Sequence, residues 1–172
     1  MHFDFISYNL SNILKINIQA MKTVFDSMDN FIDQPYDVTR VYESMLDYFE
    51  VSDRNGMLDH FYNDFNKKNF AGFCKVLSDI ATKENDPLAK WCFAEAGRLL
   101  AHHIVAIEKD IDESIKSQKG GPHVICIGSV WKSWPLLKDS FEKGKIYSLS
   151  FLVYGVFFIP QKYSMVIGQY PE

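Results

Sequence analysis

A strand that runs through a Gly-Ser pair into a helix is the part of this chain best suited to chemistry. Residues 123–137 read HVICIGSVWKSWPLL, and 124–127 form an apolar run with β-branched members, the pattern of a strand covered on both faces. Ser133 is a good helix N-cap, and Pro135 falls in the first turn, where its missing N–H costs nothing. Unpaired backbone N–H groups around Gly128 would let a flat base or a phosphate approach closely. The same spacing also fits the ordinary strand–turn–helix connections of α/β proteins, most of which bind nothing.

Four segments of the sequence resemble, in the same order and at similar intervals, the eukaryotic N-acetylglucosamine kinases. They are TVFDSMDN at 23–30, DFNKKNFAGFCK at 64–75, DPLAKWCFAEAGRLLAHHIVAIEKDID at 86–112, and GSVWKSW at 128–134. That family belongs to the BadF/BadG-type ATPases, sugar kinases whose actin-like ATPase fold is shared with heat-shock proteins and actin. The resemblance extends from about residue 20 to about residue 141. It implies an α/β chain, mostly helical with few strands, that forms part of the carboxy-terminal lobe of this fold.

The resemblance implies an adenosine site made of two facing groups of residues. Ala71 and Gly72 would lie on one side of the adenine and ribose, and Gly128, Ser129 and Ser133 on the other. Small residues allow two backbones to approach a flat ring, and serine hydroxyls can hydrogen-bond ribose or phosphate oxygens. Without the resemblance, the Ala71-Gly72 pair would be interpreted as a helix-packing contact.

The implied reaction is the ATP-dependent phosphorylation of N-acetyl-D-glucosamine to its 6-phosphate, with Mg²⁺ as cofactor and a homodimer as the full-length enzyme. Phosphoryl transfer needs donors around the phosphates, a magnesium ion and a carboxylate base. The family supplies them from a glycine-rich hairpin and an aspartate in an amino-terminal lobe, and this sequence contains no such hairpin. We therefore expect no catalytic residue and no magnesium ligand in this chain, and no turnover by the chain alone. The alternative is a non-catalytic nucleotide-binding or dimerising lobe that associates with a full-length kinase.

The resemblance divides the chain into three segments. Residues 20–143 match part of the kinase lobe with its adenosine site, whereas 1–19 and 144–172 match nothing in the family. No repeat or linker interrupts the matched part, so one compact lobe is expected. The uncharged stretch IYSLSFLVYGVFFI at 146–159 is too short for a spanning helix, and its aromatic and β-branched content favours strands.

Composition limits the environment and the partners of the chain. It is 47% hydrophobic with mixed charges, which excludes a disordered tail, and its net charge of −4 without basic clusters argues against nucleic acid. Cys74, Cys92 and Cys126 are odd in number, widely spaced and set among apolar residues, which indicates buried free thiols in a reducing compartment. We expect a cytoplasmic protein that neither enters a membrane nor binds nucleic acid.

The histidines do not predict a metal site. His102 and His103 are adjacent on a predicted helix, so their side chains point about 100° apart and cannot share one metal ion. His60 and Asp64 have the i, i+4 spacing of two ligands, but a third ligand is not evident.

Local signals predict where the elements begin. Asp86 followed by Pro87 is a strong helix start, and residues 53–56 predict a turn. Apolar residues at helical spacing predict that 20–115 is mostly helical, followed by a strand at 123–127. Trp131 and Trp134 flank the Gly-Ser turn, and packing is the expected role of both.

Overall fold

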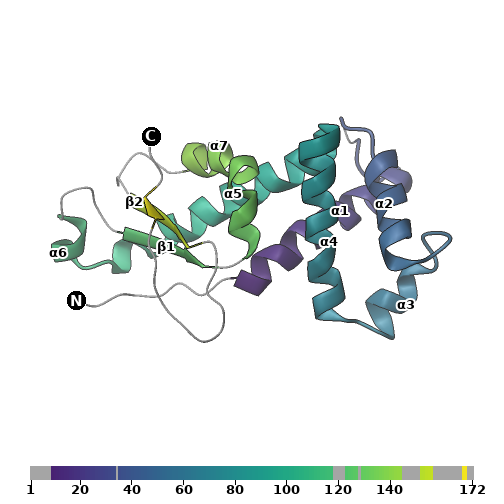
Figure 1. The fold of residues 1–172 in the computed structure, drawn as a ribbon, viewed down its shortest axis with the longest axis horizontal. Coiled ribbons are helices and arrows are strands. Elements are labelled where there is room, and N and C mark those ends of the chain that lie inside the picture. Colours follow the sequence, from purple (N-terminus) through teal and green to yellow (C-terminus); the bar gives the residue numbers. More distant parts are fainter. Residues whose placement is uncertain are drawn as a thin grey trace. The chain divides into compact units, whose positions relative to one another are not determined.

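The fold is given by a computed structural model that describes residues 9–33, 35–117, 123–127, 129–144, 152–156 and 168–169. Side chains are described for 15–33, 35–117 and 130–144. The chain divides into two compact units (Figure 1), one of residues 10–93 and the other built mainly from residues 94–172. Each unit has its own packing and is described separately.

In the unit of residues 10–93, the described secondary structure is helical, with turns and loops between the helices. The unit contains α1 (Asn9–Met28), α2 (Thr39–Phe49), α3 (Met57–Tyr62), α4 (Lys67–Asp79), the π-helical turn η1 (Ile80–Glu84) and the start of α5 (Pro87–Ile107). Apolar side chains recur at helical spacing along α1, α2 and α4, and the buried residues of each lie on one face. The predicted helical content of this part of the sequence is confirmed.

Aromatic side chains from α2, α3 and α4 form the centre of this unit. The Phe70 ring centroid lies 5.1 Å from that of Phe49 and 5.2 Å from that of Phe61. Phe73 is fully buried and packs its ring 5.8 Å from Phe49. Aromatic pairs at such distances contribute about 0.5–1.5 kcal/mol beyond the burial of their area. The cluster therefore fixes α4 against α2.

Helix starts in this unit follow the local signals in the sequence. The Asp86 Oδ1 accepts the backbone N–H of Ala89 at 2.8 Å, and α5 begins at Pro87. Asn66 caps α4 in the same way by accepting the N–H groups of Lys68 and Asn69. A side-chain oxygen at this position satisfies backbone donors that the first helical turn leaves unpaired. The predicted start of α5 is confirmed.

The second unit carries the predicted strands. It contains the end of α5, the short helices η2 (Glu108–Asp110) and α6 (Glu113–Lys116), β1 (His123–Ile127), η3 (Ser129–Ser133), α7 (Trp134–Gly144), β2 (Leu152–Val156) and β3 (Gly168–Gln169). β1 pairs with β2 in parallel, with His123 opposite Leu152 and Ile127 opposite Val156, and β3 is antiparallel to β2. Parallel neighbours need a crossover connection, and η3 with α7 supplies it. β1 coincides with the strand predicted at 123–127, and β2 lies within the stretch predicted to form strands.

Within this unit, α7 crosses α5 at two small residues. A Cβ atom at Gly97 would collide with the Leu137 carbonyl oxygen and lie 3.2 Å from the Phe141 backbone nitrogen. A Cβ at Gly144 would lie only 2.8 Å from the Ala101 Cβ. Glycine at both places allows the two helix backbones to approach more closely than any larger residue would permit. Leu137 and Phe141 are fully buried as a result.

The boundary between the units was not expected from the sequence, which predicted one compact lobe. It falls at residues 93 and 94, inside the continuous helix α5. Domain boundaries are recognised in a sequence by exposed linkers rich in Pro, Gly or polar residues. Because a helix carries the chain from one unit into the next, no such composition marks the division.

Candidate nucleotide site

The FAGFC segment lies on α4, and its two small residues have different surroundings. Ala71 is partly buried, and Gly72 is exposed. A Cβ at Gly72 would collide with the Tyr48 Oη of α2, and that hydroxyl donates a hydrogen bond to the Asn69 carbonyl oxygen at 2.9 Å. Gly72 is therefore needed for the packing of α2 against α4, whatever else it contacts.

Tyr48 is the residue at this position that sequence reasoning missed. Its ring packs 5.5 Å from Phe73 and 5.0 Å from Phe49, and burial raises the pKa of its hydroxyl. A tyrosine buried at one end commonly places its hydroxyl on a backbone acceptor. No local pattern around Tyr48 signals the contact, because its partners on α4 are supplied by the tertiary fold.

The second half of the predicted site follows β1. η3 begins at Ser129 immediately after the turn position, and α7 begins at Trp134, directly after Ser133. In open sheets with parallel strands, ligands bind beyond the carboxyl ends of the strands. Residues 128–133 follow the carboxyl end of β1, and Ser133 is partly buried there. Gly128 and the side chain of Ser129 lie outside the described residues.

The tryptophans of this segment pack inward. Trp131 and Trp134 are each 9% exposed, and their ring centroids lie 5.7 Å apart. Trp134 also meets the buried Phe141 ring edge-on, with centroids 5.4 Å apart. The expected packing role of both tryptophans is confirmed. They hold η3 against α7 and so support the backbone that follows β1.

The two halves of the predicted adenosine site belong to different units. Ala71 and Gly72 lie in the unit of residues 10–93, and Gly128, Ser129 and Ser133 belong to the other. Each half is described only within its own unit, so their pairing around one nucleotide stays a prediction.

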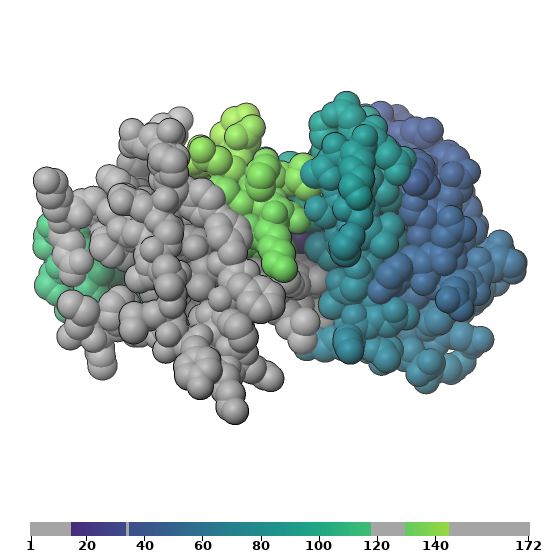
Figure 2. All heavy atoms as spheres, viewed as in Figure 1, coloured from purple at the N-terminus to yellow at the C-terminus, as the bar shows by residue number. Residues whose placement is uncertain are grey.

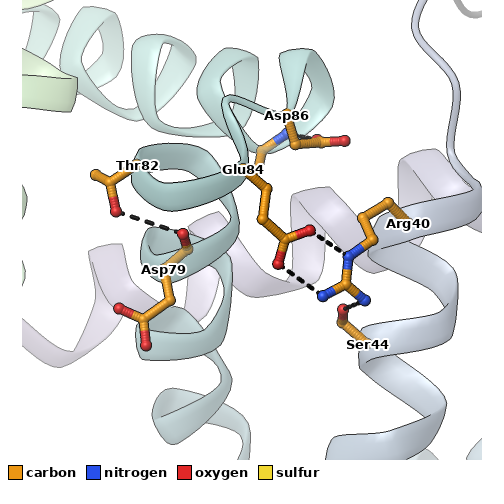
Figure 3. A network of polar contacts seen from close by, with 7 residues as sticks. Arg40, Ser44, Asp79, Thr82, Glu84 and Asp86 are labelled. Atoms are coloured by element: carbon orange, nitrogen blue, oxygen red, sulfur yellow. Dashed lines mark hydrogen bonds and ion pairs between the residues drawn. The ribbon is translucent and has the colours of Figure 1, made fainter.

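A polar network joins α2 to the π-helical turn η1 (Figure 3). The Arg40 guanidinium donates to both Glu84 carboxylate oxygens, from Nε at 2.5 Å and from Nη2 at 2.7 Å, and its Nη1 donates to the Ser44 Oγ at 2.8 Å. The hydrogen bond from Arg40 lowers the pKa of Glu84. π-helical turns are often found at functional sites, but here the turn presents Glu84 to an arginine of the same unit. We interpret the network as structural.

Two of the cysteines are buried free thiols, as the sequence predicted. Cys74 and Cys92 are 8% and 1% exposed, and burial raises the pKa of each thiol to about 12. Because the thiolate is the nucleophile and the metal ligand, neither residue is suited to catalysis at neutral pH. The surroundings of Cys126, on β1, lie outside the described side chains.

No group of three or more His, Cys, Asp or Glu residues that could hold a metal ion occurs among the described residues. Within the same residues, no helix is both long enough and apolar enough to cross a membrane. No protein-family model matches the chain.

Proposed function

We propose that this chain contributes the adenosine-binding part of an ATP-dependent kinase that phosphorylates N-acetyl-D-glucosamine to its 6-phosphate. The observation that carries the proposal is the position of the GSVWKSW motif. It connects β1 to α7 in a parallel strand–helix–strand unit, and α/β proteins that bind a nucleotide commonly do so beyond the carboxyl ends of such strands. Four collinear segments that resemble the kinase family support the same conclusion.

The proposed contacts with the nucleotide follow from the size and the hydrogen-bonding groups of each residue. Gly128 would let the adenine or ribose approach the backbone, and the hydroxyls of Ser129 and Ser133 would hydrogen-bond ribose or phosphate oxygens. On α4, Ala71 is the better candidate of the small pair, because it lies about 100° around the helix from the position where Tyr48 packs on Gly72. The packing of Tyr48 would then hold the Ala71 surface in place.

Nucleotide binding by the chain tests the proposal directly. We expect isothermal titration calorimetry with ATP or ADP to detect binding, and Ala71→Leu or Gly128→Val to remove it by filling the space of the nucleotide. Ala106→Leu is the matched control, since Ala106 is an exposed alanine on a helix and its enlargement should leave affinity unchanged. Circular dichroism would establish that each variant is folded.

Two outcomes would count against the proposal. One is a folded chain that binds no adenine nucleotide, and the other is nucleotide binding that neither Ala71→Leu nor Gly128→Val weakens. A second assay, ADP formation that depends on N-acetylglucosamine, separates the two functional alternatives. Binding without phosphorylation would favour a non-catalytic lobe, whereas turnover would show that the chain itself contains the catalytic groups.

A further inference from the structure

The turn between α2 and α3 (Figure 1) contains the only Asn-Gly pair in the sequence, Asn55-Gly56. Asn55 is exposed and Gly56 partly so, and this part of the chain contributes to the surface drawn in Figure 2. Asparagine is chemically labile. When glycine follows it, the next backbone nitrogen can attack the side-chain amide carbon with little steric hindrance.

Three hydrogen bonds oppose that attack in the folded turn. The Asp53 Oδ1 accepts the backbone N–H of Asn55 at 2.8 Å and that of Gly56 at 3.0 Å, and the Asn55 carbonyl accepts from the Leu58 N–H at 3.0 Å. Together they restrain rotation about the Cα–C bond of Asn55. Attack requires this rotation, and the hydrogen of the attacking nitrogen is held by the Asp53 carboxylate.

Packing explains why glycine follows Asn55. A Cβ atom at Gly56 would lie 2.8 Å from the Val51 Cβ and 3.1 Å from its Cγ1. The backbone of Gly56 has an ordinary φ of −57°, so the close approach to Val51, and not an unusual backbone angle, excludes larger residues. The fold therefore requires glycine directly after the exposed Asn55.

We propose that Asn55 is a site of spontaneous deamidation whose rate is controlled by the turn that Asp53 forms. The Gly56 N–H loses its proton to a base from solvent, and the nitrogen forms a bond to the Asn55 Cγ. The bond from Cγ to the amide nitrogen breaks, and ammonia leaves. Water then opens the cyclic succinimide at either carbonyl, which yields aspartate or isoaspartate. No electrons are exchanged with another molecule.

The modification would loosen the attachment of α3. Both products place a second carboxylate beside Asp53. Isoaspartate also lengthens the backbone by one atom, which displaces the Asn55 carbonyl from the Leu58 N–H. α3 starts at Met57, whose side chain is fully buried, so a change in the preceding turn acts on a core residue. Arg54, in the same turn, forms an ion pair with Asp29, which follows α1, so a displaced turn would also move one partner of that pair.

Mass spectrometry of the aged chain tests the proposal. The purified full chain is incubated at mildly alkaline pH, folded or in urea, and digested with trypsin, which cuts after Arg54 and Lys67. The resulting peptide also contains Asn63 and Asn66, which are not followed by glycine and serve as internal controls. We expect conversion at Asn55 alone, and faster conversion in urea than in the folded chain.

Two variants separate the hydrogen bonds from the charge. Asp53→Ala removes both bonds to Asp53, and one net hydrogen bond changes an equilibrium by about fivefold, so conversion should accelerate by roughly tenfold or more. Asp53→Asn keeps an acceptor oxygen and should stay near the wild-type rate. Equal rates for the folded and urea-unfolded wild type would overturn the proposal, and this comparison remains decisive if Asp53→Ala does not fold. A folded Asp53→Ala chain that converts at the wild-type rate would overturn it too, as would equal conversion at Asn63.

Discussion

Replacing Gly72 by alanine should destabilise the chain, although alanine is the better helix former. Gly72 lies inside α4, where exchange to alanine ordinarily gains about 1 kcal/mol. The new Cβ would collide with the Tyr48 Oη, which is held by its 2.9 Å hydrogen bond to the Asn69 carbonyl. The collision must either break that bond or move the ring of Tyr48 away from Phe73.

The expected change in the free energy of unfolding is the sum of these opposing effects. Breaking the hydrogen bond costs about 1 kcal/mol, and overpacking costs about 1–2 kcal/mol more. After the helix-propensity gain, Gly72→Ala should lower the free energy of unfolding by about 1–2 kcal/mol. In a Tyr48→Phe background the clashing oxygen is absent, and the ring Cζ at 3.4 Å is in ordinary contact. There the same substitution should raise stability by about 1 kcal/mol.

Urea denaturation of the four chains, followed by circular dichroism, measures this coupling. The expected coupling between Gly72 and Tyr48 is about 2–3 kcal/mol, within the range found for residues in direct contact. A change in midpoint without a change in slope would show that stability, and not the denatured state, was altered. If Gly72→Ala stabilised the chain equally in both backgrounds, Tyr48 would not occupy the space beside Gly72, and the reasoning would be refuted.

Other consequences of the structure can be measured in the same way. Gly97→Ala should lower the free energy of unfolding by about 1–2 kcal/mol, since its Cβ meets backbone atoms of α7 that cannot move aside; a stabilised variant would contradict the close crossing of α5 and α7. Cys74 and Cys92, with pKa values of about 12, should resist alkylation at neutral pH in the folded chain and react fully in urea; rapid labelling of the folded chain would show that they are accessible. Arg40 lowers the pKa of Glu84 below its ordinary 4.5, so the stabilisation from this pair is present above that pH and is lost as the pH falls through the lower, folded-state value. The difference in urea midpoint between wild type and Glu84→Gln should therefore shrink on acidification. A difference that grows would contradict the lowered pKa of Glu84.

At the candidate site, some structural features could be predicted from the motifs in the sequence and others could not. The Gly-Ser turn was predicted between a strand and a helix, and the structure has β1 before it and α7 after it. The motif could not indicate the 3-10 helix η3 that separates them, nor the parallel pairing of β1 with β2, which lies beyond α7. For FAGFC, the helix was predictable, whereas the contact that explains Gly72 was not.

The sequence by itself determined the features whose causes are local. Asp86 and Pro87 specify a helix start because a side-chain oxygen and a missing N–H act within one turn. The apolar spacing of α1, α2 and α4 likewise marks the faces that must be buried. The tertiary structure alone decided which buried faces meet. Arg40 and Glu84 are 44 residues apart, and Gly97 meets a helix that lies beyond β1. Such contacts depend on the shapes of both partners at once. The residues next to either partner in the sequence therefore do not predict the contact.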